Sequence, residues 1–181
     1  LSFTKLNGTT YSLNLDEVNF NLTHGLAFYI TVLGVNVLGL ETRIISPQIV
    51  VDWIPPTPSL IRDGNGTHDI DFQSDVERIS ASWNEFFDAE SDIVEYFYCI
   101  GSRPDFCNIL NQTSVVLDLR AQAKVGLEHG RTYFVSVTAI NSAGLSTTSS
   151  SNGVTIDTSP PVVQGFAITS GIVIDQNTTN E

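Results

Sequence analysis

The sequence predicts an all-β protein made of antiparallel β-sandwiches, and two observations lead to this prediction. Short runs of alternating polar and apolar residues, separated by Gly, Pro, Asn and Asp, fill most of the 181 residues, and helical periodicity is scarce. In addition, "HGLAFYITVLGVNVLGL" (24–40) returns as "HGRTYFVSVTAINSAGL" (129–145), so that His24 corresponds to His129 at a spacing of 105 residues. That spacing is the length of one small sandwich.

The strands of the complete repeat are expected in the following order. An opening strand is predicted in "PTPSLIRDG", and the next ones in "RISASWNEF", "VEYFYCIG", "SVVLDL", "TYFVSVTAI" and "GVTID". In "RISASW", Ile79, Ala81 and Trp83 alternate with serines, so their side chains are predicted to face the core. The same alternation predicts that one set of residues in the 129–145 copy faces inward, namely Tyr133, Val135, Val137 and Ala139.

The repeat divides the chain into three pieces. Residues 53–157 form one complete repeat, residues 1–52 match only its second half, and residues 158–181 match only the opening of a next repeat. The linkers "DWIPPTP" and "DTSPP" close the repeats at the same phase, and paired prolines favour an extended, stiff connection. We therefore expect tandem sandwiches arranged as a linear rod.

The half repeat at 1–52 raises the question of what completes it, because half a sandwich leaves an apolar face and strand edges open. Three answers are compatible with the sequence. The missing strands belong to a longer tandem array, or residues 158–181 of one molecule donate a strand to the next molecule, or the first half forms a rearranged, smaller sheet. The first two answers make the protein a link in a longer object, whose partners are copies of itself or adjacent repeats of the same chain.

The charge excludes several classes of partner. The chain has 8 Lys and Arg against 20 Asp and Glu, a net charge of −12. Such a surface repels phosphate backbones and anionic lipid headgroups, so we expect no nucleic acid and no membrane partner. The sequence also contains no apolar run long enough to span a bilayer, so membrane insertion is not expected.

The residues around Trp83 and Tyr133 resemble the fibronectin type III family of immunoglobulin-like sandwiches. "ISASW" supplies a Trp on the second strand, and "LEHGRTYFVSVTAINSAG" places Leu127 six residues before Tyr133. The resemblance implies a tyrosine corner, in which the phenol hydroxyl bonds to upstream backbone. In the first copy Phe28 replaces this tyrosine, which keeps the ring and loses the hydrogen bond. The resemblance covers one full module and two partial ones, and implies little about function.

Two further features point to an extracellular or cell-surface location. Cys99 and Cys107 flank "CIGSRPDFC" and are predicted to form a disulfide, which would stabilise the fold by about 2.5 kcal/mol through loop closure. Acceptor sequences for N-linked glycans occur five times, at Asn7, Asn21, Asn65, Asn111 and Asn177. We expect a secreted glycoprotein that carries N-linked glycans as its covalent additions.

No catalytic motif is present, so we expect neither an enzyme nor a cofactor. The two equivalent histidines are assigned to a structural turn, and four clustered aromatic residues are assigned to the core rather than to a sugar-binding platform: Trp83, Phe86, Phe87 and Tyr96. Calcium is the only ion for which the sequence offers ligands. The acidic loops supply weak candidates, Asp69, Asp71, Asp88 and Asp92, with Asp52 and Asp157 at the linkers, and the sequence favours solvated acidic turns over a calcium site.

The sequence therefore favours a structural or adhesive extracellular glycoprotein whose modules assemble head to tail into a rod or filament. The alternative is a ligand-binding ectodomain of an adhesion receptor. An accessory module of a secreted carbohydrate-active enzyme is a third reading, and it would need a catalytic domain outside this sequence.

Overall fold

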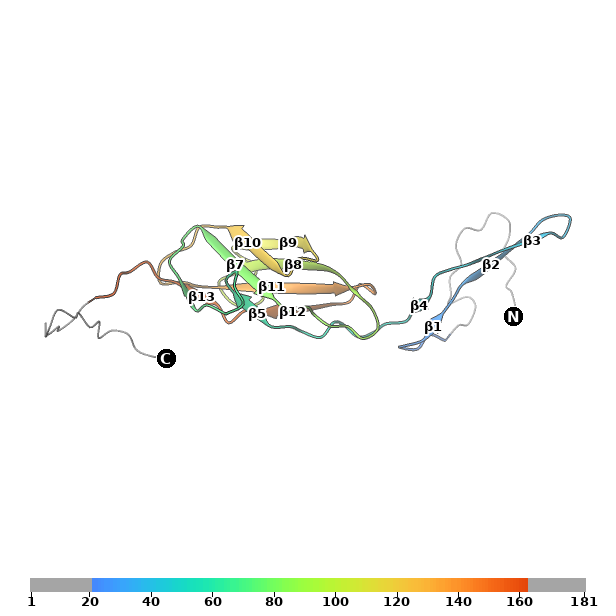
Figure 1. Ribbon diagram of the computed structural model, residues 1–181, viewed down its shortest axis with the longest axis horizontal. Helices are drawn as coiled ribbons and strands as arrows, with labels where there is room; N and C mark the ends of the chain where they lie inside the picture. Colours follow the sequence, from blue (N-terminus) through green and yellow to red (C-terminus); the bar gives the residue numbers. More distant parts are fainter. Residues whose placement is uncertain (1–20, 163–181) are drawn as a thin grey trace. The chain divides into compact units, whose positions relative to one another are not determined.

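The computed structural model describes residues 21–162, and every regular element in them is a β-strand (Figure 1). The all-β prediction is therefore confirmed for this part of the chain. The chain divides into two compact units, Leu1–Ile54 with Ala89–Ser91, and Pro55–Asp88 with Asp92–Glu181. The division after Ile54 falls within the "DWIPPTP" linker.

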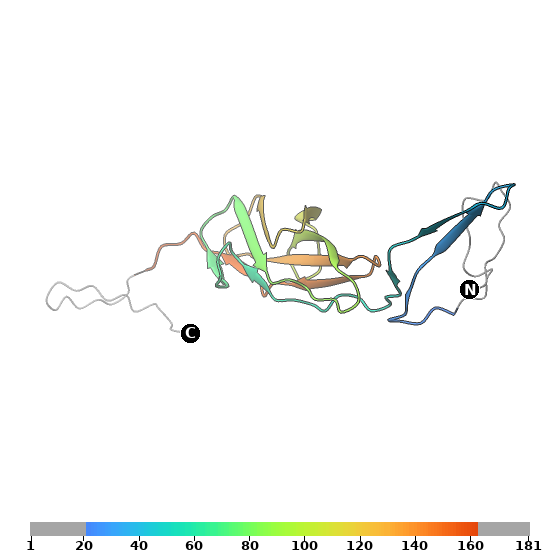
Figure 2. The same cartoon turned by 45° about the vertical axis from the view of Figure 1, so that its right-hand side comes forward.

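The second unit contains two facing sheets (Figure 2). The smaller sheet has the order β10-β7-β5, formed by β5 (Ile61–Asp63), β7 (Arg78–Trp83) and β10 (Arg120–Lys124), and all its pairs are antiparallel. The larger sheet has the order β6-β13-β11-β8-β9, with β12 also paired to β11. Its strands are β6 (Phe72–Gln73), β8 (Ile93–Gly101), β9 (Leu110–Val116), β11 (Thr132–Asn141), β12 (Ser146–Ser150) and β13 (Val154–Ile156).

The core of this unit lies between the two sheets, where the alternating residues predicted to face inward are buried. Ile79, Ala81 and Trp83 of β7 are buried against the alternate residues of β11. The serines between them do not all reach solvent, because Ser82 donates a hydrogen bond from its hydroxyl to the carbonyl of Gly66 in a covering loop (3.0 Å). The β11 residues in the core are Tyr133, Val135, Val137 and Ala139, as predicted.

Tyr133 forms the corner that the sequence motif implies. Its hydroxyl oxygen accepts a hydrogen bond from the backbone N–H of Glu128 at 3.0 Å, one residue beyond the buried Leu127. This bond ties the start of β11 to the chain that enters it.

The predicted disulfide between Cys99 and Cys107 is present. It closes a loop that folds back over β11 and β12. The backbone N–H of Asp105 donates to the hydroxyl of Ser136 (3.0 Å), and Ser150 donates its hydroxyl to the Asp105 carboxylate (2.7 Å). Ser136 is buried for this reason, although alternation along β11 predicts an outward side chain.

The described part of the first unit contains two short strand pairs. β1 (Ala27–Phe28) pairs with β4 (Ile49–Val50), and β2 (Thr31–Val35) pairs with β3 (Glu41–Ile45), both antiparallel. Their register repeats that of the second unit at a spacing of 105. Thr31 pairs with Ile45 as Ser136 pairs with Ser150, and Phe28 pairs with Ile49 as Tyr133 pairs with Val154.

The turn between β2 and β3 also repeats a turn of the second unit. The Asn36 side-chain oxygen accepts hydrogen bonds from the N–H groups of Leu38 (2.9 Å) and Leu40 (3.0 Å). In the second unit, Asn141 accepts equivalent bonds from Ala143 (3.1 Å) and Leu145 (2.8 Å). A short amide side chain that binds its own turn explains why both copies place Asn at this position.

The two copies differ in burial. Val137 of β11 is fully buried, while its counterpart Val32 is 56% exposed. The same contrast holds for Val135 and Ile30, and for Val154 and Ile49. The strands that bury this face in the second unit, β5, β7 and β10, have no counterpart among the described residues of the first unit.

Candidate functional site

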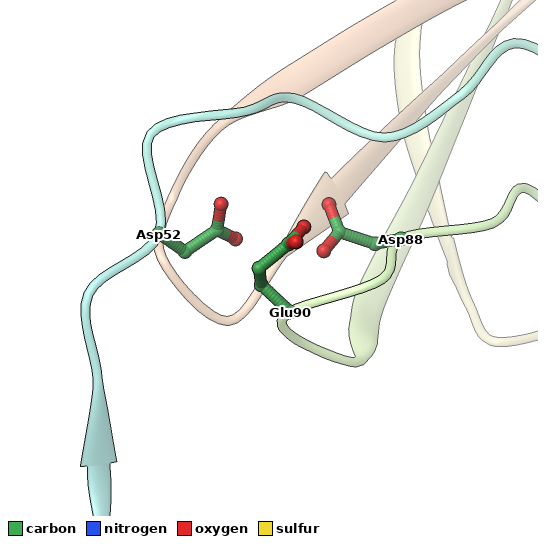
Figure 3. Close-up of side chains that lie close together, drawn as sticks. All are labelled: Asp52, Asp88 and Glu90. Atoms are coloured by element: carbon green, nitrogen blue, oxygen red, sulfur yellow. The ribbon is translucent and has the colours of Figure 1, made fainter. Parts of the chain in front are cut away.

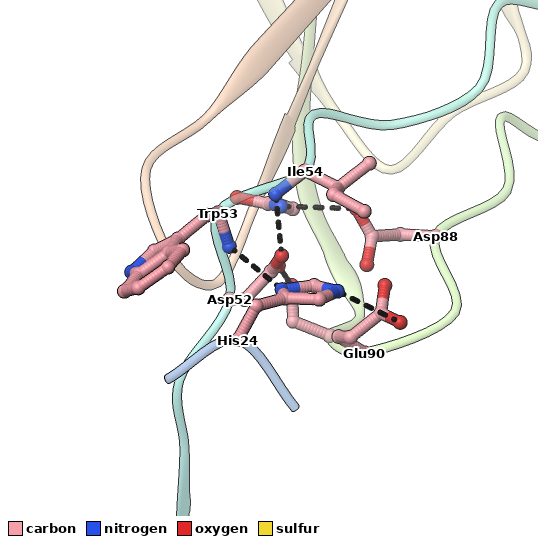
Figure 4. A network of polar contacts seen from close by, with 8 residues as sticks. His24, Asp52, Trp53, Ile54, Asp88 and Glu90 are labelled. Atoms are coloured by element: carbon pink, nitrogen blue, oxygen red, sulfur yellow. Dashed lines mark hydrogen bonds and ion pairs between the residues drawn. The ribbon is translucent and has the colours of Figure 1, made fainter. Parts of the chain in front are cut away.

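The histidine at the start of each copy binds the chain that leaves the same copy. His24 Nδ1 accepts a hydrogen bond from the backbone N–H of Trp53 (3.2 Å; Figure 4), and His129 Nδ1 accepts one from Thr158 (3.1 Å). Each bond spans 29 residues. An Nδ1 that accepts must be unprotonated, so Nε2 carries the proton of the neutral ring. This bond gives both histidines a structural role, in agreement with the sequence interpretation.

Within the first unit, the same histidine lies beside an acidic pair. His24 Nε2 is 3.5 Å from Glu90 Oε1, and carboxylate oxygens of Asp52 and Glu90 lie within 4.8 Å of each other (Figure 3). Asp52 is buried, and its two oxygens accept hydrogen bonds from the N–H of Ile54 (3.0 Å) and the hydroxyl of Ser91 (2.7 Å). These oxygens therefore have protein partners without an ion.

The acidic residues that the sequence singled out for calcium have separate roles. Asp88 accepts a hydrogen bond from the Asn141 amide (3.0 Å) inside the second unit. Asp69 accepts one from the backbone N–H of Asp63 (2.7 Å), and Asp71 one from the Asn152 amide (3.3 Å). Asp92 is exposed. Sequence reasoning named Asp52 and the loop of Glu90 separately, and nothing in the sequence indicates that the two residues meet.

Asp63 is a buried carboxyl group that is not among the calcium candidates named from the sequence. Its side chain is fully buried, and its Oδ2 accepts a hydrogen bond from the N–H of Gly153 (3.0 Å). Burial raises the pKa of Asp63 to about 6, and hydrogen bonds from Ser151 and Gly153 only partly oppose this effect. Its other oxygen, Oδ1, is buried with no hydrogen-bond partner. The group lies in the packed interior, so we assign it a role in stability rather than in catalysis.

The aromatic cluster has one exception to its predicted burial. Trp83, Phe86 and Tyr96 are buried, and Tyr96 packs against both other rings with centroids 6.0 and 5.8 Å away. Phe87 is 67% exposed, so its assignment to the core is wrong. The chain leaves the sheet after Trp83, and a backbone bridge between Phe87 and Thr57 lies outside the main strands. Strand alternation therefore no longer predicts the direction of the Phe87 side chain.

A shallow cavity of about 430 Å³ opens beside the tyrosine corner. Glu128 and Arg131 line it, and they form an ion pair of 2.6 Å with each other. Because the two charges neutralise each other, the cavity lining carries no net charge with which to select an ionic ligand.

Three of the five predicted glycosylation sites lie in the described residues, and all three are exposed. Asn21 precedes β1, Asn65 lies in the loop after β5, and Asn111 lies within β9. Asn7 and Asn177 lie outside the described residues, as does most of segment 158–181. The exposure required for a glycan is met at each described site.

Comparison with known proteins assigns no family. No family model matches the sequence, and no curated protein matches it at a significant level. Within residues 21–162, no helix is long and apolar enough to cross a membrane.

Proposed function

We propose that this chain is a structural or adhesive extracellular module of the fibronectin type III type, and that it acts as a repeat unit of a rod or filament assembled head to tail. The observation that carries the proposal is the equivalence of the two copies. Three features recur at a spacing of 105 residues. They are the register of the paired strands, the turn closed by an asparagine side chain, and the hydrogen bond that the histidine accepts from the chain leaving the copy. Repetition of one module along a chain is typical of extended structural and adhesive proteins.

The exposed apolar face of the first unit supports a role within a larger assembly. Ile30, Val32 and Ile49 are counterparts of core residues, and exposed apolar faces of this kind are typical of surfaces that another chain or domain covers. Strands from adjacent repeats, or from a neighbouring copy by strand complementation, would complete such a face. Either arrangement extends the assembly in one direction.

The disulfide and the exposed glycosylation sequences support an extracellular location. A disulfide persists in oxidising compartments, and glycans are added in the secretory pathway. The second candidate, a ligand-binding ectodomain of an adhesion receptor, shares this location. The recurrence of one strand register and one histidine contact in both copies favours the structural role.

Electron microscopy of the native material tests the proposal. Filaments or rods whose repeat equals one or two modules are the expected result, because equivalent modules joined by proline-rich linkers repeat at a fixed interval. Monodisperse short particles that bind a soluble ligand would overturn the structural role and favour the receptor ectodomain.

A further inference from the structure

The open strand edges of the second unit differ in how they are protected against pairing with another copy. An exposed edge strand is a template for association, and proteins protect it with charge, proline or short length. β10 carries Arg120 and Lys124 at its two ends, whereas β5 has three residues and β6 has two. These three edges follow the usual rules, whereas β12, which pairs with β11 alone among the described strands, has five residues without charge or proline, "STTSS".

The strand β9 has neither charge, proline nor short length, and its pairing with β8 contains two register shifts. Among residues 21–162 it pairs with β8 alone, and it extends over seven residues, "LNQTSVV", which include no charged residue, no proline and no glycine. Uncharged segments of this length and β propensity are typical of sequences that stack into intermolecular sheets. The charge of Glu95 lies on the neighbouring strand β8, where its carboxylate accepts a hydrogen bond from the Ser114 hydroxyl (2.6 Å).

The same strand carries a glycosylation sequence. Asn111 and Thr113 lie in β9 and are both exposed, while Leu110 at the start of the strand packs partly against the core. In the first copy, Asn7 stands at almost the same phase of the repeat, 104 residues earlier. The acceptor sequence is therefore found on the longer of the two described edge strands that carry no charge, β9 rather than β12.

We propose that an N-linked oligosaccharide on Asn111 covers the open edge of β9 and prevents strand pairing between copies. A strand added to β9 would lie about 4.8 Å from it. A branched oligosaccharide on Asn111 occupies that approach. The inference rests on the proposed extracellular function, since only a chain that enters the secretory pathway receives this glycan.

The test compares two variants that each lose one glycan. Thr113→Ala removes the acceptor sequence at Asn111 and keeps the asparagine, and Thr67→Ala does the same at Asn65 in the loop after β5. The full chain is secreted from a eukaryotic cell line, and mass spectrometry measures occupancy at both sites. Sedimentation and infrared spectroscopy then measure association and intermolecular β-sheet.

We expect Thr113→Ala to form intermolecular sheet at a concentration at least about tenfold lower than the parent, a ratio that corresponds to about 1.4 kcal/mol. Thr67→Ala is expected to match the parent. Adding Gln112→Lys to Thr113→Ala should restore the parent behaviour, because a charge protects an edge as a glycan does. Trimming the glycans of the folded parent with an endoglycosidase, which leaves one sugar on an uncharged asparagine, should reproduce the association without any effect of folding.

Equal association of the two variants would overturn the inference, as would an unoccupied Asn111 in secreted protein. Electron microscopy of the same samples separates this result from the proposed function. Filaments that form in all variants with an unchanged repeat support the module role even where the edge inference fails. Secreted protein that has no glycan and no filament would overturn both.

Discussion

The hydroxyl oxygen of Tyr133 accepts the backbone N–H of Glu128 at 3.0 Å, and the counterpart of Tyr133 in the first copy, Phe28, has no hydroxyl. The second unit therefore satisfies a backbone group that the first copy cannot satisfy in this way. Tyr133 is also buried in the core of that unit, so the hydrogen bond and the ring packing act at one position.

We expect Tyr133→Phe to lower the free energy of unfolding of the second unit by about 1–3 kcal/mol, because the N–H of Glu128 loses its acceptor while the ring packing is kept. Chemical denaturation monitored by tryptophan fluorescence measures the change. Tyr29→Phe is the matched control, since the Tyr29 hydroxyl binds Gln48 on an exposed surface (3.2 Å). If Tyr133→Phe lowers the free energy of unfolding as little as the control does, the hydrogen bond of Tyr133 does not stabilise the second unit.

The second prediction concerns the pH dependence caused by Asp63. Its folded-state pKa of about 6 lies above the ordinary aspartate pKa of 3.8, because burial disfavours the charged form. The folded protein therefore binds this proton more tightly than the unfolded chain. The resulting stability is fully present below pH 3.8 and is lost as the pH rises through 6, by up to about 3 kcal/mol.

Asp63→Asn should remove this slope between pH 4 and pH 6 and should leave the variant more stable than the parent at pH 7, because its side-chain oxygen can still accept from Gly153. Thermal unfolding across this pH range measures the effect. The exposed Asp118→Asn variant serves as the control and should keep the slope of the parent. If the stability of Asp63→Asn changes with pH as steeply as that of the parent, another group controls the pH dependence.

The strands that could be predicted from sequence are those in which alternation and burial agree. β7, β8 and β11 fall where alternating apolar residues indicate them, and Trp83 and Tyr133 lie in the core. Alternation does not predict β12, because its sequence, "STTSS", contains no apolar residue to alternate. It forms because its backbone pairs with β11, which is information that local periodicity does not contain.

The candidate site could be predicted only in part, because its contacts are non-local. The disulfide and the equivalence of His24 and His129 are visible in the sequence. The proximity of Asp52 and Glu90 depends on residues 38 positions apart, and the burial of Asp63 depends on Gly153, 90 residues away. Neither contact follows a fixed separation along the chain, so the sequence alone does not indicate it.

A third prediction concerns Gly101, at the base of the disulfide loop. A Cβ atom built on Gly101 would lie 1.5 Å from the carbonyl oxygen of Phe106, a backbone atom that cannot move without opening the loop. We expect Gly101→Ala to destabilise the second unit by more than about 3 kcal/mol. Gly126→Ala is the control, because no atom lies within 4 Å of its added Cβ. Similar melting temperatures for the two variants would show that the loop adapts.

A fourth prediction concerns calcium. Both oxygens of Asp52 accept hydrogen bonds from the protein, and Glu90 faces His24. These donors already satisfy the buried Asp52 carboxylate, so the fold does not need a calcium ion at this place. We therefore expect the melting temperature to stay the same when the chelator EDTA or millimolar calcium is added. A calcium-dependent rise that Glu90→Gln abolishes would instead establish a site.

The final prediction compares the two copies within one molecule. Val32 and Val137 occupy equivalent positions in equivalent hairpins, yet Val32 is 56% exposed and Val137 is fully buried. Backbone amides exchange with solvent through local opening, and a hairpin that lacks a packed face opens at a lower free energy. We expect the β2–β3 amides to exchange at least ~100-fold faster than those of β11. Hydrogen exchange with mass spectrometry measures both segments in the same sample.

The comparison should then be repeated at concentrations where filaments form, since strands from an adjacent copy would slow exchange in β2–β3 and leave β11 unchanged. Protection of both hairpins in dilute monomer would mean that the first unit buries this face by itself, and would remove the reason to seek a covering partner.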